Sequence, residues 1–143
     1  MKVLSLGSLN IDYTYRVDHF VQKGETVASD SLQVFSGGKG LNQSIALAKA
    51  GAEVYHAGAI GEDGKFLLAV MEEAGVDTSC VKILDDVRTG NAIIQNEKRA
   101  TIAFFCTAEP TRRSQKPRST QCSSDLMPET ALCFKMRLMN CHI

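Results

Sequence analysis

The stretch FSGGKGLNQSIALAKAG, residues 35–51, sets three glycines within four positions directly before an amphipathic run. Because glycine has no Cβ, the backbone of such a loop can come close to a bound polar molecule. The free N–H groups at the start of the following helix would face that molecule, and Asn42 on the first turn can both donate and accept hydrogen bonds. The apolar positions of the run predict a helix, and Gly51 stands where it would end. The stretch therefore predicts a loop and helix that can hold hydroxyl groups.

Segments on both sides of this stretch alternate between strand and helix patterns. Strands are predicted at 2–8, 53–61, 80–84 and 89–95, and a second helix is predicted at 64–75 with Asp63 as its cap. Two further β-prone segments, 13–20 and 25–35, are separated by a turn and could form a small antiparallel excursion. Strands that alternate with helices imply an α/β fold with a mostly parallel sheet and helices packed on it.

Two polar residues, Asn10 and Asp12, follow the carboxyl end of the first predicted strand, which is where ligands bind in open α/β sheets. A carboxylate at this place could accept hydrogen bonds from two hydroxyl groups of a sugar. Plainer interpretations stay open, because the glycines could form a simple strand–helix turn and Asp12 could be an exposed loop residue. His19 and His56 are expected to be structural. Neither phosphate-loop pattern, G-x-x-x-x-G-K-[ST] or G-x-G-x-x-G, is present.

The overall composition argues against several classes of function. The formal net charge is zero, so nothing draws the whole chain to nucleic acid or to an anionic membrane. No apolar run reaches the roughly 20 residues that span a bilayer, and no small-residue cleavage site follows the N-terminal apolar run, which favours a cytoplasmic protein. The five cysteines form no C-x-x-C pair and fit neither a zinc site nor a disulfide framework.

The spacing of several motifs resembles the signature of the ribokinase (PfkB) family of carbohydrate kinases. Three features fall at that family's spacing: GGKGLNQS, Gly51, and Gly61 ahead of EDG. The segment GSLNID is similar to the family's N-terminal sugar motif. The resemblance covers residues 1 to about 97, and it is closest to the ribokinases because Lys39 is followed by Asn42-Gln43.

The resemblance implies a ribokinase-like (Rossmann-like) α/β fold, with a mostly parallel sheet, helices on both faces and a small β-sheet lid at about residues 12–36. Residues 1–97 would be the N-terminal part of such a domain. Six residues would contact the sugar by position: Asn10, Asp12, Gly38, Lys39, Gly40 and Asn42. The family transfers the γ-phosphoryl group of ATP to a sugar hydroxymethyl with magnesium, often with potassium activation. This implies phosphorylation of D-ribose to ribose 5-phosphate, and a homodimer paired through the lid.

The family's catalytic parts lie far downstream of its sugar motifs, and nothing here matches them. The resemblance places a catalytic aspartate and a glycine-rich helix N-terminus in a GAGD-type motif, which the 143 residues do not contain. The family's ATP-site residues are missing as well. The chain is therefore predicted to be truncated and without kinase activity. Two alternatives stay open: a non-catalytic sugar-binding fragment, or a kinase for another sugar or nucleoside.

The composition changes abruptly near residue 95. All 11 glycines lie at or before Gly90, and all three prolines lie after residue 95. The net charge changes from −4 in residues 1–95 to +4 in residues 96–143. Average glycine usage of roughly 7% would place about three glycines in the second segment, which has none.

A shift of reading frame would explain this change. Joining the last base of each codon to the first two of the next admits NNCILLYGGANQ from Ala100 to Arg112, and QNEINELPY from Phe134 to Ile143. Both are consistent with what the family is expected to show after TGNAIIQN. Residues 98–143 are therefore predicted to be a frameshifted tail that was not selected to pack and is largely disordered. Its segment ATIAFFC can still pair as a strand, because it is apolar and β-prone.

Overall fold

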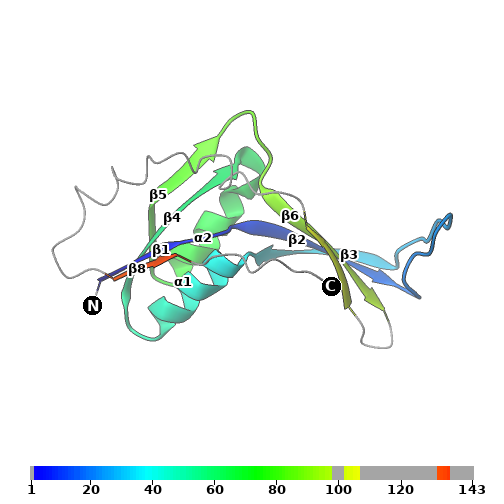
Figure 1. The fold of residues 1–143 in the computed structure, drawn as a ribbon, viewed down its shortest axis with the longest axis horizontal. Helices are drawn as coiled ribbons and strands as arrows, with labels where there is room; N and C mark the ends of the chain where they lie inside the picture. The colour runs from blue at the N-terminus through cyan, green and yellow to red at the C-terminus, as the bar shows by residue number, and fades with distance from the viewer. Residues whose placement is uncertain (1, 98–101, 107–131, 136–143) are drawn as a thin grey trace.

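The computed structural model describes residues 2–97, 102–106 and 132–135. These residues form two four-stranded sheets that follow one another along the long axis of the molecule (Figure 1). We call the first sheet with its two helices the body and the second sheet the lid. Within residues 2–97 the chain crosses between body and lid three times.

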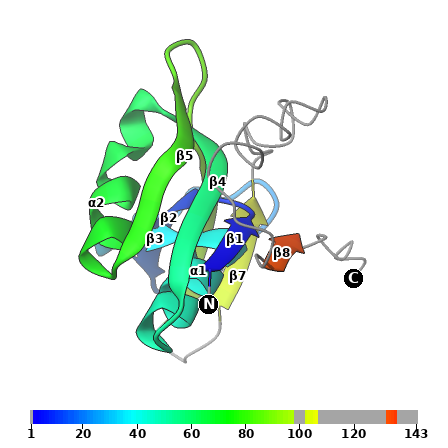
Figure 2. The same cartoon turned by 90° about the vertical axis from the view of Figure 1, so that its left-hand side faces the viewer.

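The body is a parallel sheet with the strand order β5-β4-β1-β8. Its elements in chain order are β1 (Lys2–Leu6), α1 (Lys39–Lys49), β4 (Glu53–Gly61), the short 3-10 helix η1 (Glu62–Gly64), α2 (Lys65–Glu73), β5 (Val76–Leu84) and β8 (Leu132–Lys135). The helices α1 and α2 contact each other and lie on the same side of the sheet (Figure 2). Right-handed crossovers give this arrangement when β1, β4 and β5 follow one another in one direction. Helices on both faces are therefore not found among the described residues.

The lid has the strand order β3-β2-β6-β7. Its strands are β2 (Asn10–Val17), β3 (Ser31–Gly37), β6 (Gly90–Glu97) and β7 (Ile102–Cys106). The strands β2 and β3 are antiparallel, which confirms the predicted excursion, and β7 confirms the strand predicted for ATIAFFC. The segment predicted as a strand at 89–95 corresponds to β6. This strand pairs in parallel with β2 of the lid and does not belong to the body sheet. This membership in the lid was not predicted.

The hydrophobic core lies between the two helices and the face of the body sheet that they cover. Its buried side chains come from strands, helices and the first crossing into the lid: Leu9, Ile11, Leu41, Val54, Ile60, Leu67, Met71 and Val76. The middle of β1 is buried as well, as expected for a central parallel strand with a continuous apolar sequence. Because Leu9 and Ile11 belong to this core, packing in the body extends to the place where the lid begins.

Both helices end at glycine as predicted, but α2 begins differently. Gly51 and Gly75 each have a φ of 86°, the left-handed conformation that ends many helices. At the start of α2, Gly64 is the capping residue and no side chain caps the helix. Asp63 was expected to do this, but its carboxylate instead accepts a hydrogen bond from the N–H of Thr89. A long-range contact has replaced the predicted local one.

Most of the predicted tail, at 98–101, 107–131 and 136–143, lies outside the described residues. The frameshift and the disorder expected there stay predictions. Two pieces of this tail are described as strands: β7 at the edge of the lid and β8 at the edge of the body next to β1. No helix in the described part of the chain is both long enough and apolar enough to cross a membrane.

Candidate functional site

The glycine loop at the start of α1 packs against the connection between β1 and β2. Gly38 has a φ of 101°, which other residues rarely adopt, and a Cβ there would lie 2.5 Å from the carbonyl oxygen of Ser8. A Cβ on Gly40 would lie 2.5 Å from the carbonyl carbon of Gly7. The two backbones touch, so this loop requires glycine at both positions.

Ser8 joins the two segments. Its hydroxyl accepts a hydrogen bond from the N–H of Lys39 at 3.1 Å, and its carbonyl accepts one from the N–H of Leu41 at 3.1 Å. Two of the free N–H groups at the start of α1 therefore bind Ser8 instead of facing a ligand. Ser8 was missed among the predicted site residues, and the pair Gly7-Ser8 at the end of the first strand was its only sequence signal.

Asp12 reaches the same loop from the lid. The strands β2 and β3 pair so that Asn10 lies beside Gly37 and Asp12 beside Phe35. The Asp12 carboxylate lies where a Cβ on Gly37 would be. Burial raises the pKa of Asp12, and no hydrogen bond or ion pair within the described residues opposes this effect. A partly desolvated carboxylate without a partner is well suited to accept hydrogen bonds from hydroxyl groups.

Two amide side chains near the loop contain buried oxygen atoms that have no hydrogen-bond partner among the described residues. They are Oδ1 of Asn10 and Oε1 of Gln43. A buried acceptor without a partner costs about 1–3 kcal/mol. Asn10 lies beside Gly37 in the sheet, so its amide can offer this acceptor to a ligand that enters the junction.

Lys39 and Asn42 lie on the exposed part of the first turn of α1. The N–H of Asn42 donates to the carbonyl of Gly38 at 3.1 Å, which continues the helix and leaves the Asn42 side chain exposed. The structure therefore brings all six predicted residues to one junction, between the end of β1, the start of β2 and the start of α1. Contact of these residues with a sugar stays a prediction.

A buried histidine lies beneath α1. Its Nδ1 is 2.8 Å from the hydroxyl of Ser44, which ties β4 to the helix. His56 is fully buried, and this burial lowers its pKa to about 4 despite the opposing influence of the Gly7 carbonyl. A neutral, hydrogen-bonded histidine is consistent with the structural role expected for it.

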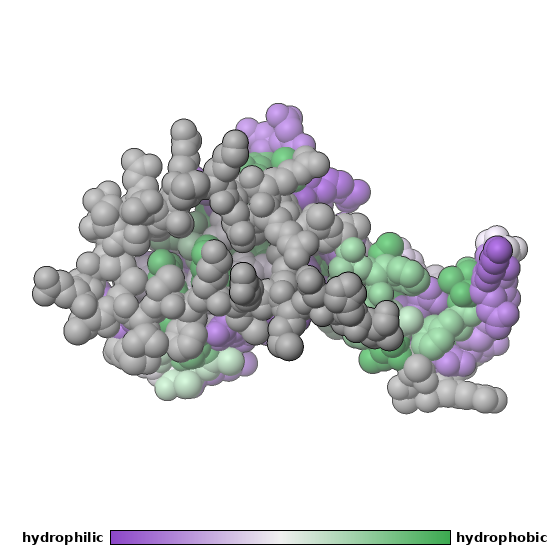
Figure 3. Space-filling view, in the orientation of Figure 1, coloured by the Kyte–Doolittle hydropathy of each residue, from purple (hydrophilic) through white to green (hydrophobic). Residues whose placement is uncertain are grey.

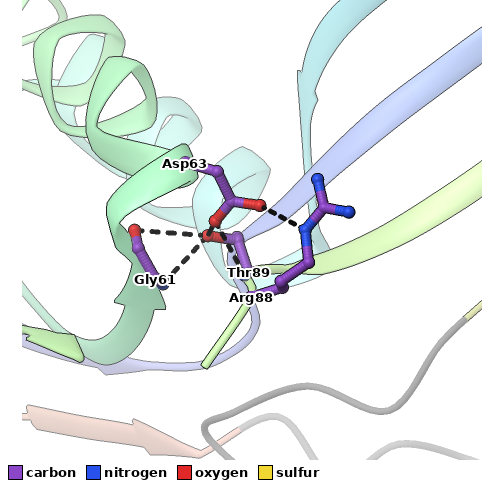
Figure 4. A network of polar contacts seen from close by, with 4 residues as sticks. All are labelled: Gly61, Asp63, Arg88 and Thr89. Atoms are coloured by element: carbon purple, nitrogen blue, oxygen red, sulfur yellow. Dashed lines mark hydrogen bonds and ion pairs between the residues drawn. The ribbon is translucent and has the colours of Figure 1, made fainter. Parts of the chain in front are cut away.

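A second polar cluster joins the end of β4 to the start of β6 (Figure 4). The Thr89 hydroxyl accepts a hydrogen bond from the N–H of Gly61 at 2.9 Å and donates to Oδ1 of Asp63 at 2.7 Å. The N–H of Thr89 donates to the same oxygen at 2.9 Å, and Nε of Arg88 lies 3.3 Å from Oδ2. Desolvation acts to raise the pKa of Asp63, but the bonds from Thr89 and Arg88 together lower it. We call these four residues the Thr89 cluster.

The described residues contain no group of three or more His, Cys, Asp or Glu side chains that could hold a metal ion. The glycine-rich start of α1 gives two of its N–H groups to Ser8, so it is not an open phosphate cradle. The junction offers a carboxylate and amide groups, which suit hydroxyl groups, together with the exposed ammonium of Lys39.

A profile of the family described as pfkB family carbohydrate kinase matches residues 1–131 of the chain. The chain belongs to this family. The match runs beyond residue 97, where the resemblance was expected to end, and so includes part of the predicted tail.

Curated members of the family match about two thirds of the chain. The ribokinase of Haemophilus influenzae is 38% identical over 95 residues, which is 65% of this chain and 31% of that protein. The ribokinase of Staphylococcus aureus is 40% identical over 96 residues, 65% of this chain and 32% of that protein. The chain thus spans about a third of the length of these relatives.

Solved structures confirm the fold of this family. A crystal structure of ribokinase from Cryptococcus neoformans in complex with ADP matches with a TM-score of 0.70 and 41% identity, over 76% of this chain and 34% of that chain. The structure of Arabidopsis thaliana ribokinase complexed with ribose and ATP matches with a TM-score of 0.65 and 27% identity, over 74% of this chain and 35% of that chain. The expected ribokinase-like α/β fold is therefore confirmed.

Proposed function

We propose that the chain is the sugar-binding part of an ATP-dependent carbohydrate kinase that phosphorylates D-ribose to ribose 5-phosphate. The observation that carries the proposal is the junction of β2 and α1, where the Asp12 carboxylate lies against a glycine turn and has no partner among the described residues. The names of relatives support ribose as the sugar, since the proteins from Haemophilus influenzae and Staphylococcus aureus are ribokinases. The Arabidopsis neighbour was solved with ribose and ATP.

The residues at this junction can bind and orient a sugar. The two oxygens of Asp12 can accept hydrogen bonds from adjacent hydroxyl groups, and the amides of Asn10 and Asn42 can both donate and accept. The small glycines leave room for the sugar close to the backbone. The phosphoryl group would come from ATP, with magnesium and potassium as the ions.

Titration calorimetry with the 143-residue chain tests the binding of D-ribose. We expect saturable heat with D-ribose, and weaker binding of D-fructose and adenosine. The variant Asp12→Asn should weaken binding at least about tenfold, because a hydrogen bond to a charged group contributes roughly 1.5–3 kcal/mol. Asp85→Asn makes the same change of charge in the exposed turn between β5 and β6 and should bind normally. No saturable heat with any of the three ligands would refute both the ribose proposal and the sugar-binding alternative.

We further propose that these 143 residues bind sugar without turning it over, which is the second candidate function. The 143 residues contain no GAGD-type motif, which supports this. A coupled assay with D-ribose, ATP and magnesium should show no turnover above background. A rate above background that disappears in Asp12→Asn would overturn the proposal.

The tail at 98–143 is proposed to come from a shifted reading frame. The loss of glycine after Gly90 and the two fitting codon runs support this. Sequencing the coding DNA from codon 90 to beyond the stop tests it directly. Restoration of one base should open a frame that runs through a GAGD-type motif. If no such frame exists, the tail is native and the proposal fails.

A second copy of the chain is proposed to pair with the lid. In the register of the lid sheet Val34, Tyr13, Ile93 and Phe105 lie side by side across all four strands. Three of these side chains are 41–60% exposed, and hydrophobic residues gather on the lid in Figure 3. Burial of such a row in a dimer is favourable in proportion to its apolar area.

Sedimentation velocity tests this dimer. Val34→Lys should shift the chain to monomer, because a lysine at the β3 end of the apolar row would lose its hydration in the interface. Phe66→Lys places the same charge on an exposed apolar position of α2 in the body and should leave the dimer intact. A wild-type chain that is monomeric at every concentration would refute the dimer.

A cytoplasmic location of the protein stays a prediction.

A further inference from the structure

The three crossings between body and lid are held in different ways. The first two, from β1 to β2 and from β3 to α1, pack against each other through Gly7, Ser8 and Gly40 and form part of the candidate site. The third crossing, residues 85–89 between β5 and β6, lies at the end of β4 and is held by the Thr89 cluster. This third attachment has no role in the proposed binding of the sugar itself.

Thr89 is held by the body at several points. Its side chain is 1% exposed, and its hydroxyl lies between the N–H of Gly61 and the carboxylate of Asp63, both in the body. Its own N–H donates to that carboxylate as well, at 2.9 Å. Arg88 adds a contact at 3.3 Å, but its side chain is 81% exposed and such a surface ion pair contributes little. Thr89 and Asp63 therefore make the attachment.

The attachment leaves little room for movement. A Cβ on Gly64 would collide with the Thr89 hydroxyl, and a Cβ on Gly61 would collide with the carbonyl oxygen of Val87. Backbone of the body thus touches the crossing directly on two sides. Thr89 can shift only if these contacts open, so the start of β6 has a fixed position on the body.

The position of β6 determines the position of the candidate site residues on β2, because the two strands pair in the lid sheet. The strands β2 and β6 pair in parallel over their whole length, with Gly90 beside Asn10 and Ala92 beside Asp12. A displacement of Thr89, which directly precedes Gly90, would therefore move β6 and β2 together. The residues of α1 would keep their position, because α1 packs on the body sheet.

We propose that Thr89 and Asp63 are positioning residues for sugar binding. They hold the start of β6 on the body, and through the pairing of β6 with β2 they keep Asn10 and Asp12 in reach of Lys39 and Asn42 on α1. This inference rests on the proposed function for its sugar, but the attachment of the lid can be measured without any ligand. Both residues act through β6 and β2 and do not touch the sugar.

Hydrogen exchange of the sugar-free 143-residue chain, followed by mass spectrometry, tests the attachment. In Thr89→Val the hydroxyl is lost while the shape is kept. We expect amide exchange to accelerate several-fold in peptides covering 10–17 and 90–97, and to stay unchanged in peptides covering 53–60 and 65–73, since only the N–H of Gly61 loses its acceptor in the body. In calorimetry the dissociation constant for D-ribose should rise about tenfold, since a small misplacement of a binding group is costly.

Two further variants separate positioning from general stability. Thr89→Ser keeps the hydroxyl and should restore both the exchange pattern and the affinity for D-ribose to within about twofold of wild type. Arg88→Ala removes the exposed partner of Asp63 and should change neither. Thr89→Ser also keeps the test informative if Thr89→Val fails to fold.

Each outcome decides the proposal. Faster exchange throughout the chain, including α2, would mean that Thr89 serves only stability and would overturn the positioning role. Unchanged exchange in 10–17 would overturn it too, because the lid would then be held without the cluster. If wild type binds no D-ribose, the proposed function fails, while the exchange pattern in the sugar-free chain still supports or refutes the attachment.

Discussion

The body and the lid are both four-stranded sheets, but they bury their apolar side chains to very different degrees. In the body, α1 and α2 cover one face of the sheet, and Ile60, Leu67 and Met71 are fully buried. In the lid, no described helix covers the sheet, and Val34 and Phe104 remain 50% and 62% exposed. Because apolar burial is the main source of stability, the body carries most of the folding free energy and the lid depends on its attachments.

The candidate site lies where these two unequal regions meet. The glycine turn and Asn42 belong to the start of α1 on the body, whereas Asn10 and Asp12 belong to β2 of the lid. A change in the body should therefore alter whether the chain folds. A change in the lid should alter what the folded chain binds or pairs with. Paired variants can test this division, beginning with those that should change stability most.

The largest difference is expected between matched leucine truncations. Leu67→Ala removes a fully buried side chain of α2 and should lower the free energy of unfolding by about 3 kcal/mol, because it leaves a cavity in the core. Leu32→Ala removes a side chain that is 48% exposed in β3 and should cost less than about 0.5 kcal/mol. Urea denaturation measures both. Equal losses of unfolding free energy in the two variants would mean that the lid has a hydrophobic core as stabilising as that of the body.

The next difference is expected between two glycines. Gly40→Ala forces a Cβ against the backbone of Gly7 and should lower the free energy of unfolding by about 2 kcal/mol. The same variant should also lose the binding of D-ribose. Gly24→Ala, at the turn between β2 and β3, has a φ of 81° but open space around it, and should cost about 1 kcal/mol without loss of binding. Denaturation and calorimetry on the same samples measure both effects. Normal binding by Gly40→Ala would show that the close approach to Gly7 is dispensable.

Local patterns in the sequence predicted most of the elements. The strand predicted at 53–61 is β4 as observed, and Gly51 ends α1, because a hydrophobic period and a left-handed glycine are properties of a few neighbouring residues. The six candidate residues also lie together at one junction, although their contact with a sugar stays a prediction. They stand at a strand end and a helix start that any parallel α/β arrangement brings to one edge.

Contacts between distant residues were not predictable in the same way. Asp63 and Thr89 are 26 residues apart, and their bond leaves no periodic signal in either segment. For the same reason the sequence predicted β6 as a strand without indicating that it joins the lid. The helices lie on one face because of the strand order β5-β4-β1, and that order is set by tertiary packing. Ser8 acts through its backbone carbonyl as well as its side chain, and any residue type carries that carbonyl.

An effect of similar size is expected from acid, and it arises in the body. The pKa of His56 is about 4 in the folded chain and 6.5 in an ordinary setting, so the unfolded chain binds the proton more tightly. Stability is fully present above pH 6.5 and is lost as the pH falls toward 4. Between pH 8 and pH 5 this amounts to about 2 kcal/mol. Urea denaturation across this range measures it. His56→Leu should flatten the slope even if it lowers stability at every pH, and an unchanged slope would assign the effect to other groups.

The smallest effect is expected from the other histidine, at the tip of the lid, and it has the opposite sign. The hydrogen bond and charge of Glu25, 2.7 Å away, raise the pKa of His19 above 6.5. Any stability it adds is therefore present below pH 6.5 and is lost as the pH rises through the raised value. Because both side chains are exposed, His19→Asn should leave the thermal midpoint unchanged. Only amide exchange in residues 19–25 should become faster, and only at acidic pH. A shift of the midpoint in His19→Asn would show that the tip of the lid is coupled to the body, and the division between the two regions would then fail.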